Sequence, residues 1–323
     1  MRNNILLQIE NIKKALNQRN LFWKNCSSIP SWINIENVGL DQFFTKQDIA
    51  KLCYYKAINF LKSKKVNIDD CIFIEPSAGS GSFYDLLPKK SRIGIDICPI
   101  SKEIIQADFL TWTVPQSNKK IVVIGNPPFG YRAWLALEFM KKAAKFADYV
   151  FFILPMSFQS EGKGSPKNRI SGLKLVTSEL LPKNSFYSPD GKDYKVNALF
   201  QIWEKGNNEP FVEDKFLDYM EIFTTDNRKE RLCGQNKKEI ADFFLQRTFF
   251  NTPPNIVKTF DEVKYQCGYG FIIKKDKEKI KDILSKTNWY NYSNLAVHGC
   301  HHISMYHIRK VLSENGLRQQ DRL

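Results

Sequence analysis

Short apolar runs separated by loops constrain the fold of this chain more than any other feature. They span residues 72–74, 93–95, 121–124, 150–154 and 198–203. Runs of this length and composition are typical of strands that are buried on both faces of a mostly parallel sheet. A helical pattern such as Trp134 to Ala147 falls between them. We therefore predict an α/β fold in which helices cover both faces of the sheet.

Changes of pattern along the chain predict how it divides into domains. Residues 1–40 are expected to form a helical extension, because Ile and Leu recur at helical spacing over residues 4–18. Residues 41–205 contain the apolar runs and form the α/β domain. After Lys205 the alternation of strands and helices fades. Residues 206–323 are therefore expected to form a smaller, mixed C-terminal domain.

Three further segments have a recognisable pattern. Asp48 to Leu61 places apolar residues at roughly 3.6-residue spacing and predicts a helix. Lys274 to Lys286 alternates charge at helical spacing, which is typical of a solvated helix face. The stretch Ser157 to Asp193 is rich in Gly, Ser, Pro and Lys and is too long for an ordinary connector. We interpret it as a functional loop region.

The composition favours a polyanionic partner. The formal net charge is +14, and nucleic-acid sites need Lys and Arg to replace condensed counterions. The 7 cysteines are odd in number and contain no Cys-x-x-Cys pair, which argues against a disulfide framework. No apolar stretch approaches the roughly 20 residues that span a bilayer. We expect a cytoplasmic protein with no membrane partner.

A turn rich in small residues follows the first apolar run. It reads Glu75-Pro76-Ser77-Ala78-Gly79-Ser80-Gly81. Gly79 and Gly81 allow the backbone to approach a ligand closely, and in an open α/β sheet this turn lies where ligands bind. We expect the turn to bind a cofactor through Glu75, Pro76, Ser77, Ala78, Gly79 and Gly81. A tight strand-to-helix turn without a ligand is the structural alternative.

The residues around this turn favour a cofactor that lacks phosphates. Asp96 ends the second run, where a dinucleotide fold uses an acid to hold ribose hydroxyls, and Ile97 follows it. No Gly-Lys-Ser/Thr follows the turn, and Glu75 repels phosphate, which disfavours ATP and NAD. S-adenosylmethionine fits because it carries a sulfonium and an ammonium. Asp108 and Phe109 offer an acceptor and an apolar wall for its adenine, although a surface Asp beside a core Phe is the plainer interpretation.

The segment Asn126-Pro127-Pro128-Phe129 directly follows the third run. Its prolines fix φ and remove backbone donors, which leaves a rigid turn. An aromatic exocyclic amine is a poor nucleophile because its lone pair is delocalised. If the Asn126 side-chain oxygen and the Pro127 carbonyl accept its hydrogens, the nitrogen can direct that lone pair at a sulfonium methyl. Phe129 offers a face for base stacking. The structural alternative is a turn without a catalytic role.

At these motifs the chain resembles class I methyltransferases, specifically bacterial DNA adenine-N6 methyltransferases of the gamma arrangement. The resemblance covers about residues 42–203. It includes Phe43-Phe44-Thr45, the 75–81 turn, Gly94-Ile95-Asp96, Ala107-Asp108-Phe109, Gly125-Asn126-Pro127-Pro128-Phe129, Phe152-Ile153-Leu154-Pro155 and Lys195-Val196-Asn197-Ala198. It implies a Rossmann-like catalytic domain over residues 41–205 that binds S-adenosylmethionine. The cofactor contacts that it implies are Thr45, Glu75, Asp96, Asp108 and Phe109.

The resemblance also implies a substrate and a way to reach it. Double-stranded DNA is the implied partner, with the target adenine flipped out of the helix. An aromatic residue holds the second face of that base in the family, and Phe186 and Tyr187 are the candidates, although the spacing is not the usual one. Lys46 stands where the family commonly has a proline after Thr45. Residues 206–323 take the place of a target-recognition domain.

We expect a monomeric, site-specific enzyme of a restriction-modification system that acts separately from a cognate endonuclease. Two other substrate classes stay open, because Asn-Pro-Pro-Phe also occurs in rRNA base methyltransferases and, with Tyr, in glutamine methyltransferases that act on release factors. A non-catalytic nucleic-acid-binding module is the alternative from another class. The intact Glu75, Asp96, Asp108 and Asn126 argue against it.

The histidines gather near the C-terminus, at His298, His301, His302 and His307, beside Cys300. Their spacing matches no standard zinc pattern. We expect no metal here, and a polar loop or an ordinary helix surface explains them better.

Overall fold

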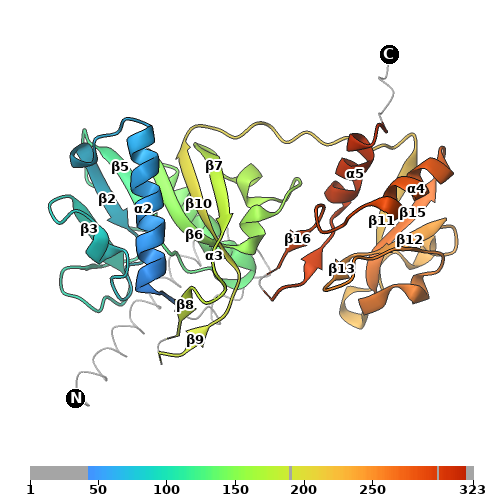
Figure 1. The fold of residues 1–323 in the computed structure, drawn as a ribbon, viewed down its shortest axis with the longest axis horizontal. Helices are drawn as coiled ribbons and strands as arrows, with labels where there is room; N and C mark the ends of the chain where they lie inside the picture. The colour runs from blue at the N-terminus through green and yellow to red at the C-terminus, as the bar shows by residue number, and fades with distance from the viewer. Residues whose placement is uncertain (1–42, 189–190, 297, 318–323) are drawn as a thin grey trace. The chain divides into compact units, whose positions relative to one another are not determined.

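The structure is a computed structural model that describes residues 43–188, 191–296 and 298–317. It divides into two compact units (Figure 1). The first unit comprises the described residues up to Phe158 together with Pro166–Glu209, and the second comprises Gln159–Ser165 and the described residues from Pro210 onward. The predicted extension 1–40, with its helix at residues 4–18, lies outside the described residues.

A seven-stranded sheet forms the first unit, in the order β4-β3-β2-β5-β6-β10-β7. Its strands are β2 (Cys71–Glu75), β3 (Arg92–Asp96), β4 (Ile105–Gln106), β5 (Lys120–Gly125), β6 (Tyr149–Pro155), β7 (Leu173–Leu180) and β10 (Ala198–Lys205). The five strands from β4 to β6 pair in parallel, while β10 is antiparallel to both β6 and β7. Every apolar run predicted as a strand is one.

The order of these strands identifies the fold. Counted along the chain, the sheet begins third, second, first, fourth and fifth, which matches the first five strands of the doubly wound nucleotide-binding order 3-2-1-4-5-6. The last strand in sequence, β10, is inserted antiparallel between the fifth and the sixth. This insertion is the hallmark of the class I methyltransferase sheet. The predicted fold class is therefore confirmed.

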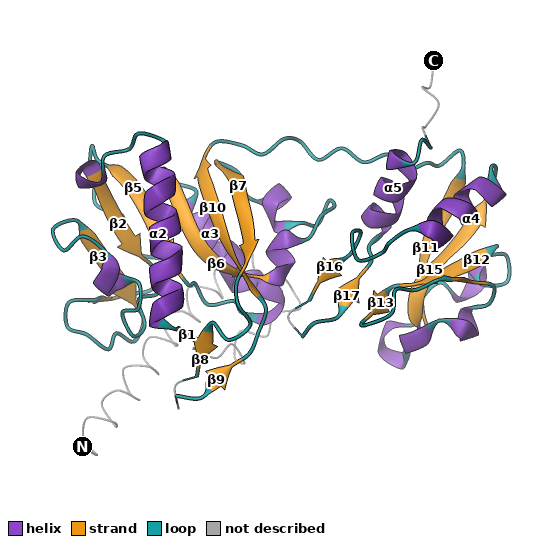
Figure 2. Ribbon diagram, in the orientation of Figure 1, coloured by secondary structure: helices purple, strands orange, loops and turns teal. Residues whose placement is uncertain are grey.

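Helix α2 (Gln47–Ser63) covers one face of the sheet, and Figure 2 draws α3 (Trp134–Ala143) behind it. In α2 the buried residues recur every three or four positions, at Ile49, Ala50, Cys53, Ala57, Ile58 and Leu61. Phe60 packs edge-to-face on Phe151 of β6, with 6.0 Å between ring centroids. Asp48 in the first turn and Lys62 in the last complement the helix dipole. Helix α3 ends at Ala143, four residues before the predicted end.

The expectation of a loop region from Ser157 to Asp193 was wrong in its middle. Residues 173–180 form β7, which is the edge strand of the sheet. Most side chains of this strand are exposed or half-buried, since only one neighbour covers it. An edge strand of this kind carries no continuous apolar run, so its polar residues resemble those of a loop.

A small antiparallel sheet lies beside the main one, in the order β1-β8-β9. Its strands are β1 (Phe44–Thr45), β8 (Phe186–Tyr187) and β9 (Asp193–Tyr194). The register sets Phe44 opposite Tyr187 and Thr45 opposite Phe186. Segments that the sequence separates by more than a hundred residues therefore lie side by side.

The second unit is a mixed α+β structure. One sheet has the order β11-β15-β12-β14, formed by Met220–Asp226, Cys267–Ile273, Phe243–Gln246 and Ile256–Val257. A smaller sheet has the order β13-β17-β16, formed by Thr248–Phe249, His301–His302 and Asn294–Leu295. The helices are α4 (Lys277–Lys286), where the charge pattern predicted one, and α5 (Met305–Glu314).

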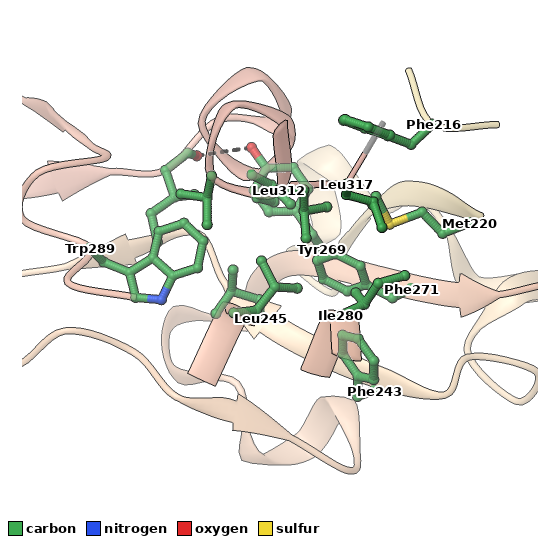
Figure 3. Packing of buried hydrophobic residues seen from close by; sticks show 14 of the residues in the cluster. Phe216, Met220, Phe243, Leu245, Tyr269, Phe271, Ile280, Trp289, Leu312 and Leu317 are labelled. Atoms are coloured by element: carbon green, nitrogen blue, oxygen red, sulfur yellow. Dashed lines mark hydrogen bonds between the residues drawn. The ribbon is translucent and has the colours of Figure 1, made fainter. Parts of the chain in front are cut away.

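The second unit has a hydrophobic core of its own (Figure 3). Phe243 and Phe271 stack on neighbouring strands with 4.7 Å between centroids, and Trp289 is almost fully buried. Ile280 of α4 and Leu312 of α5 bury their side chains in the same cluster. The Tyr269 phenol donates a 3.0 Å hydrogen bond to the Ile303 carbonyl, which satisfies its only polar group inside this core.

Two absences hold for the described residues. No helix there combines the length and the apolar character that crossing a bilayer requires. The cysteines of this part of the chain are all free, and Cys53, Cys71 and Cys267 are buried.

Gly94 is the glycine of the seven-stranded sheet at which a side chain would have the least room. A Cβ there would lie 2.7 Å from the Tyr84 ring. That ring is held by the Arg92 guanidinium, 4.0 Å from its centroid. We expect Gly94→Ala to lower the free energy of unfolding by about 1–3 kcal/mol, the usual cost of overpacking.

Urea denaturation measures this loss. Gly164→Ala is the matched control, because a Cβ at Gly164 meets nothing within 4 Å. Equal stabilities of the two variants would contradict the packing at β3.

Candidate functional site

The site lies where the parallel strands β2 and β5 end side by side. Their register pairs Ile74 with Val123, so the turn after Glu75 and the tetrapeptide after Gly125 leave the same edge of the sheet. The Ser77 hydroxyl donates a 2.9 Å hydrogen bond to the Asn126 carbonyl and joins the two segments. The predicted cofactor turn and the predicted catalytic segment therefore belong to one site.

The turn needs its glycines. Gly79 has a φ of +48° and Gly81 a φ of +85°, both in the left-handed region. A Cβ at Gly79 would also lie 3.1 Å from the Phe44 ring of β1. The backbone of this turn is thus pressed against the upstream segment. Ala78 is buried beneath it, and its amide donates to the Ile95 carbonyl at 2.9 Å.

Asp96 holds the turn against the end of β3. One carboxylate oxygen accepts a 2.8 Å hydrogen bond from the Gly79 amide, and the other accepts one of the same length from the Cys98 amide. Asp96 is half-buried, and Ile97 beside it is buried. The predicted strand-two acid therefore lies at the cofactor turn and fixes its shape.

Thr45 is joined to the same turn from β1. The Ser82 hydroxyl donates a 2.8 Å hydrogen bond to the Thr45 carbonyl. The Thr45 side chain is buried, and its Oγ1 has no hydrogen-bond partner among the described residues. A buried hydroxyl without a partner costs free energy, and in a native protein such a group calls for an explanation.

Glu75 ends β2 and is the most deeply buried carboxyl of the site, with 2% of its surface exposed. Burial raises its pKa well above the ordinary value, and the nearby Asp96 and Asp85 act in the same direction, while a backbone bond from Tyr84 opposes them. Its Oε2 has no partner among the described residues. A cationic ligand beside Glu75 would offset the desolvation that raises this pKa.

Asn126 is oriented by its amide nitrogen. Nδ2 donates a 3.1 Å hydrogen bond to the carbonyl of Phe43, which immediately precedes β1. This bond fixes which end of the amide is which. Oδ1 is buried and has no partner among the described residues. Asn126 therefore has a side-chain acceptor oxygen at the carboxyl end of β5 that no described residue uses.

Thr45, Glu75 and Asn126 share one property. Each keeps a buried oxygen without a partner in this structure, and each stands at a strand end or on β1 around the same turn. Such oxygens can accept hydrogen bonds from a ligand. The set suits a ligand rich in N–H groups and positive charge, and it disfavours phosphate.

The aromatic candidates for base stacking differ in exposure. Phe129 is half-buried and meets Phe186 edge-to-face, with 6.5 Å between centroids. Phe186 is 1% exposed, so in this structure its ring is covered. Tyr187 is half-buried, and its hydroxyl bonds to the Ser80 hydroxyl at 3.1 Å. Phe129 and Tyr187 are the two that reach the surface of the site.

Asp108 and Phe109 follow β4. The Leu110 amide donates to Asp108 Oδ1 at 3.0 Å, which fixes a turn there. Phe109 is 1% exposed and packs on Phe139 of α3, with 5.2 Å between centroids. In this structure Phe109 is a core residue, so a cofactor contact through its ring stays a prediction.

Sequence reasoning missed two contacts around the site. The Phe43 ring stacks on Tyr194 of β9 with 4.1 Å between centroids, beside the carbonyl that holds Asn126. Lys46, where the family commonly has a proline, forms a 2.8 Å ion pair with Asp193. No pattern in one sequence pairs these segments. The one available signal was that both segments contain aromatic residues.

The backbone just after the tetrapeptide is strained. Arg132 has a φ of 52° and Ala133 a φ of 61°, a region that costs non-glycine residues about 1–3 kcal/mol each. Gly130 before them also has a positive φ, and a Cβ there would lie 2.7 Å from Leu135. Strain of this kind is typical of segments whose shape serves a function.

Three of the four histidines near the C-terminus, His301, His302 and His307, form hydrogen bonds within the second unit. His302 Nδ1 bonds to the Thr248 hydroxyl, and His301 Nδ1 bonds to the Ser293 hydroxyl, both at 2.9 Å. His307 accepts the Ser304 amide at the start of α5, and its burial lowers its pKa to about 4. Within the described residues no group of three His, Cys, Asp or Glu side chains could hold a metal ion.

Comparison with known proteins gives only distant likeness. No protein-family model and no curated protein sequence matches the chain. Among solved structures, a putative RNA methyltransferase from Pyrococcus horikoshii is 18% identical over 51% of this chain and 88% of its own, with a TM-score of 0.38. The magnesium protoporphyrin IX methyltransferase from Synechocystis PCC 6803, solved with bound S-adenosylmethionine, is 11% identical over 50% and 79%, with a TM-score of 0.35.

A third similar structure is a methyltransferase from Leishmania major that depends on S-adenosylmethionine. It is 14% identical over 59% of this chain and 82% of its own, with a TM-score of 0.29. These TM-scores are too low to carry an argument about function. The fold assignment therefore rests on the strand order of the sheet itself.

Glu75 makes stability depend on pH in a definite direction. A carboxyl whose folded pKa is raised keeps its proton in the folded state where the unfolded chain has lost it. Its contribution to stability is therefore full below the ordinary Glu pKa of 4.5 and falls as pH rises. We expect Glu75→Gln to raise the melting temperature of the ligand-free protein at neutral pH.

This gain should shrink as pH falls toward 4.5, where both side chains are neutral. Melting curves of the two proteins across this range test it. Titration of His307 affects both proteins alike and cancels in the difference. A gain that is independent of pH would contradict the assigned cause.

Proposed function

We propose that this protein transfers a methyl group from S-adenosylmethionine to the N6 amine of adenine in DNA. One observation carries the proposal, namely the geometry of Asn126. Its Nδ2 is held by the Phe43 carbonyl, and its buried Oδ1 has no partner among the described residues. A fixed acceptor at the carboxyl end of a strand is what activation of a planar amine requires.

The tetrapeptide acts on the amine through its acceptors. Asn126 Oδ1 and the Pro127 carbonyl accept the two N–H bonds of the exocyclic amine, and the lone pair leaves conjugation with the ring. Pro127 and Pro128 keep these acceptors in place because their φ angles are fixed. The Ser77 hydroxyl, bound to the Asn126 carbonyl, aligns this turn with the cofactor turn. Positioning and electrostatics account for the catalysis.

The residues on β1 and β2 fit the cofactor. S-adenosylmethionine supplies an electrophilic methyl group on a sulfonium. The buried Glu75 carboxyl offers an anionic partner to a cationic ligand, and Thr45 Oγ1 offers a further acceptor. Asp96 at the end of β3 stands where an adenosine ribose is held in this fold.

DNA is the substrate that the remaining features favour. The net charge of +14 suits a polyanion, and the second unit supplies a separate body that can read bases. An adenine in a duplex must be flipped out to reach Asn126. Phe129, half-buried beside Asn126, offers a face on which that base can stack. Such an enzyme would serve a restriction-modification system.

The direct test is a methylation assay with labelled cofactor. Genomic DNA is incubated with the protein, digested to nucleosides and analysed for N6-methyladenine. Parallel reactions contain rRNA and release-factor protein, since the Asn126 geometry also suits an RNA adenine or a glutamine amide. Label found only in rRNA, or only in release-factor protein, would identify that molecule as the substrate in place of DNA. Label in none of the three would overturn the proposal.

Asn126→Ala removes the activating acceptor. We expect kcat to fall by a factor on the order of 100–1,000, because the lost bonds strengthen in the transition state. Cofactor affinity, measured by calorimetry, should stay within about twofold of wild type. Asn67→Ala is the control, since Asn67 only caps a short turn before β2.

An equal loss of turnover and cofactor affinity would contradict the role of Asn126. A normal turnover rate in the Asn126→Ala protein would show that Asn126 has no part in the mechanism.

Thr45→Val replaces the unpartnered hydroxyl by a methyl group of similar size. We expect cofactor affinity to fall roughly tenfold, as for one lost hydrogen bond to a charged ligand. The ligand-free protein should be as stable as wild type or more so, because the hydroxyl is already without a partner. Thr225→Val is the matched control. Thr225 in the second unit is also buried without a partner for its Oγ1.

The control should share the stability change and leave the affinity unchanged. Calorimetry and thermal melts measure the two quantities. Unchanged affinity of the Thr45→Val protein would exclude Thr45 from the cofactor site.

A further inference from the structure

The second unit contains a pocket of about 290 Å³, and all the residues that line it belong to this unit. Phe250 and Tyr265 stand at it, 46% and 54% exposed, and meet edge-to-face with 6.0 Å between centroids. What sets these two residues apart from single exposed side chains is that their rings meet at one pocket and form an aromatic patch, the kind of surface that marks a binding site. Asn251, Asn255 and Glu262 line the same pocket and supply hydrogen-bonding groups.

The walls of the pocket are rigid. Pro253 and Pro254 stand in one wall, where their φ angles are fixed. The Tyr290 hydroxyl donates to the Asn251 carbonyl at 2.8 Å and pins that loop. On the other side, Tyr265 has a φ of 62° and Gln266 a φ of 52°, both strained for non-glycine residues. The strained turn holds the Tyr265 ring at the pocket before any ligand arrives.

The lining carries charges of both signs, Glu262 and Lys264, beside the polar side chains. Bonds from the Thr259 backbone and hydroxyl lower the pKa of Glu262, so this carboxylate stays ionised and repels anions. A carboxylate accepts hydrogen bonds from an exocyclic amine such as that of adenine or cytosine. Amide side chains and exposed aromatic rings complete a set that matches the edges and faces of a base.

Arg228 lies in the loop that follows β11, and its side chain is held in place. Arg228 forms a two-bond ion pair with Asp226, from Nε to Oδ1 at 2.9 Å and from Nη2 to Oδ2, and the Arg228 side chain as a whole remains 44% exposed. The Asn227 amide donates to the Gln266 carbonyl at 2.9 Å, which ties this loop to the turn that presents Tyr265. Arg228 follows Asn227 in the chain, so this link joins its loop to the turn that carries Tyr265, and the N–H groups that Asp226 does not use can bind the phosphate that follows a base.

We propose that this pocket binds one unstacked base of a nucleic-acid strand, with Arg228 on the adjoining phosphate. This second base site is distinct from the one at Asn126 and does not depend on methyl transfer. An unstacked base that stacks face-on against the Tyr265 ring meets the Phe250 ring edge-on, because the two rings are T-shaped to each other. The polar edge of the base then meets Glu262 and the asparagines of the lining.

The test uses the whole protein without cofactor and single-stranded oligonucleotides that carry 2-aminopurine, a fluorescent adenine analogue. Anisotropy gives the affinity, and the emission of the bound analogue reports stacking. Tyr265→Ala should weaken binding roughly tenfold and reverse the emission change, while Tyr265→Phe keeps both. Arg228→Ala should weaken binding and lower the dependence on salt. Tyr55→Ala, an exposed tyrosine on α2, is the control.

The same pair is compared with Phe129→Ala in the background, so that a base held at the first unit cannot produce the signal. The loss caused by Tyr265→Ala should be the same in both backgrounds. Equal binding by wild type and Tyr265→Ala, an equal loss in Tyr55→Ala, or a loss that disappears with Phe129→Ala would overturn the inference. A separate methylation assay tests the proposed function by itself. Its result therefore distinguishes a failure of the second base site from a failure of the proposed function.

Discussion

The parallel pairing of β2 with β5 is the constraint on which the rest of the site depends. It sets the ends of two strands at one edge of the sheet, although their sequences lie far apart. The bond from Ser77 to the Asn126 carbonyl can form only in this register. A shift by one residue would turn the side chains of β5 to the other face and move Asn126 away from Phe43.

The site keeps its acceptors at a cost that the rest of the fold must offset. A buried polar atom without a partner typically costs about 1–3 kcal/mol, and Thr45, Glu75 and Asn126 each contribute one such atom. The central strands β5, β6 and β10 and the buried face of α2 supply the opposing stability through their apolar burial. A ligand that satisfies these atoms should stabilise the folded protein by mass action.

The parts of the fold predicted from sequence are those with a strong burial pattern. Strands β2, β5 and β6 each contain a continuous apolar run, because side chains on both faces of these strands are buried. The motifs could be placed because chemistry-bearing residues follow these strands directly, as Glu75 and Asn126 do. Composition also located the end of the α/β unit, which the structure divides at Glu209.

What sequence reasoning missed depends on pairing between distant segments. Edge strand β7 shows mixed exposure, so its residues resemble a loop. Phe186 was a reasonable stacking candidate by residue type, yet its pairing with Thr45 buries it. Neither the Phe43 carbonyl that orients Asn126 nor the ion pair of Lys46 with Asp193 leaves any local pattern.

The pairing of β1 with β8 has a consequence for how the protein is made. On the ribosome Thr45 emerges long before Phe186, its partner in the register. Strand β1 can therefore pair with β8 only after most of the first unit has been synthesised. Contacts of such long range form late in folding. A nascent chain that stops short of β8 can build the core strands β2 to β5 without a complete cofactor site.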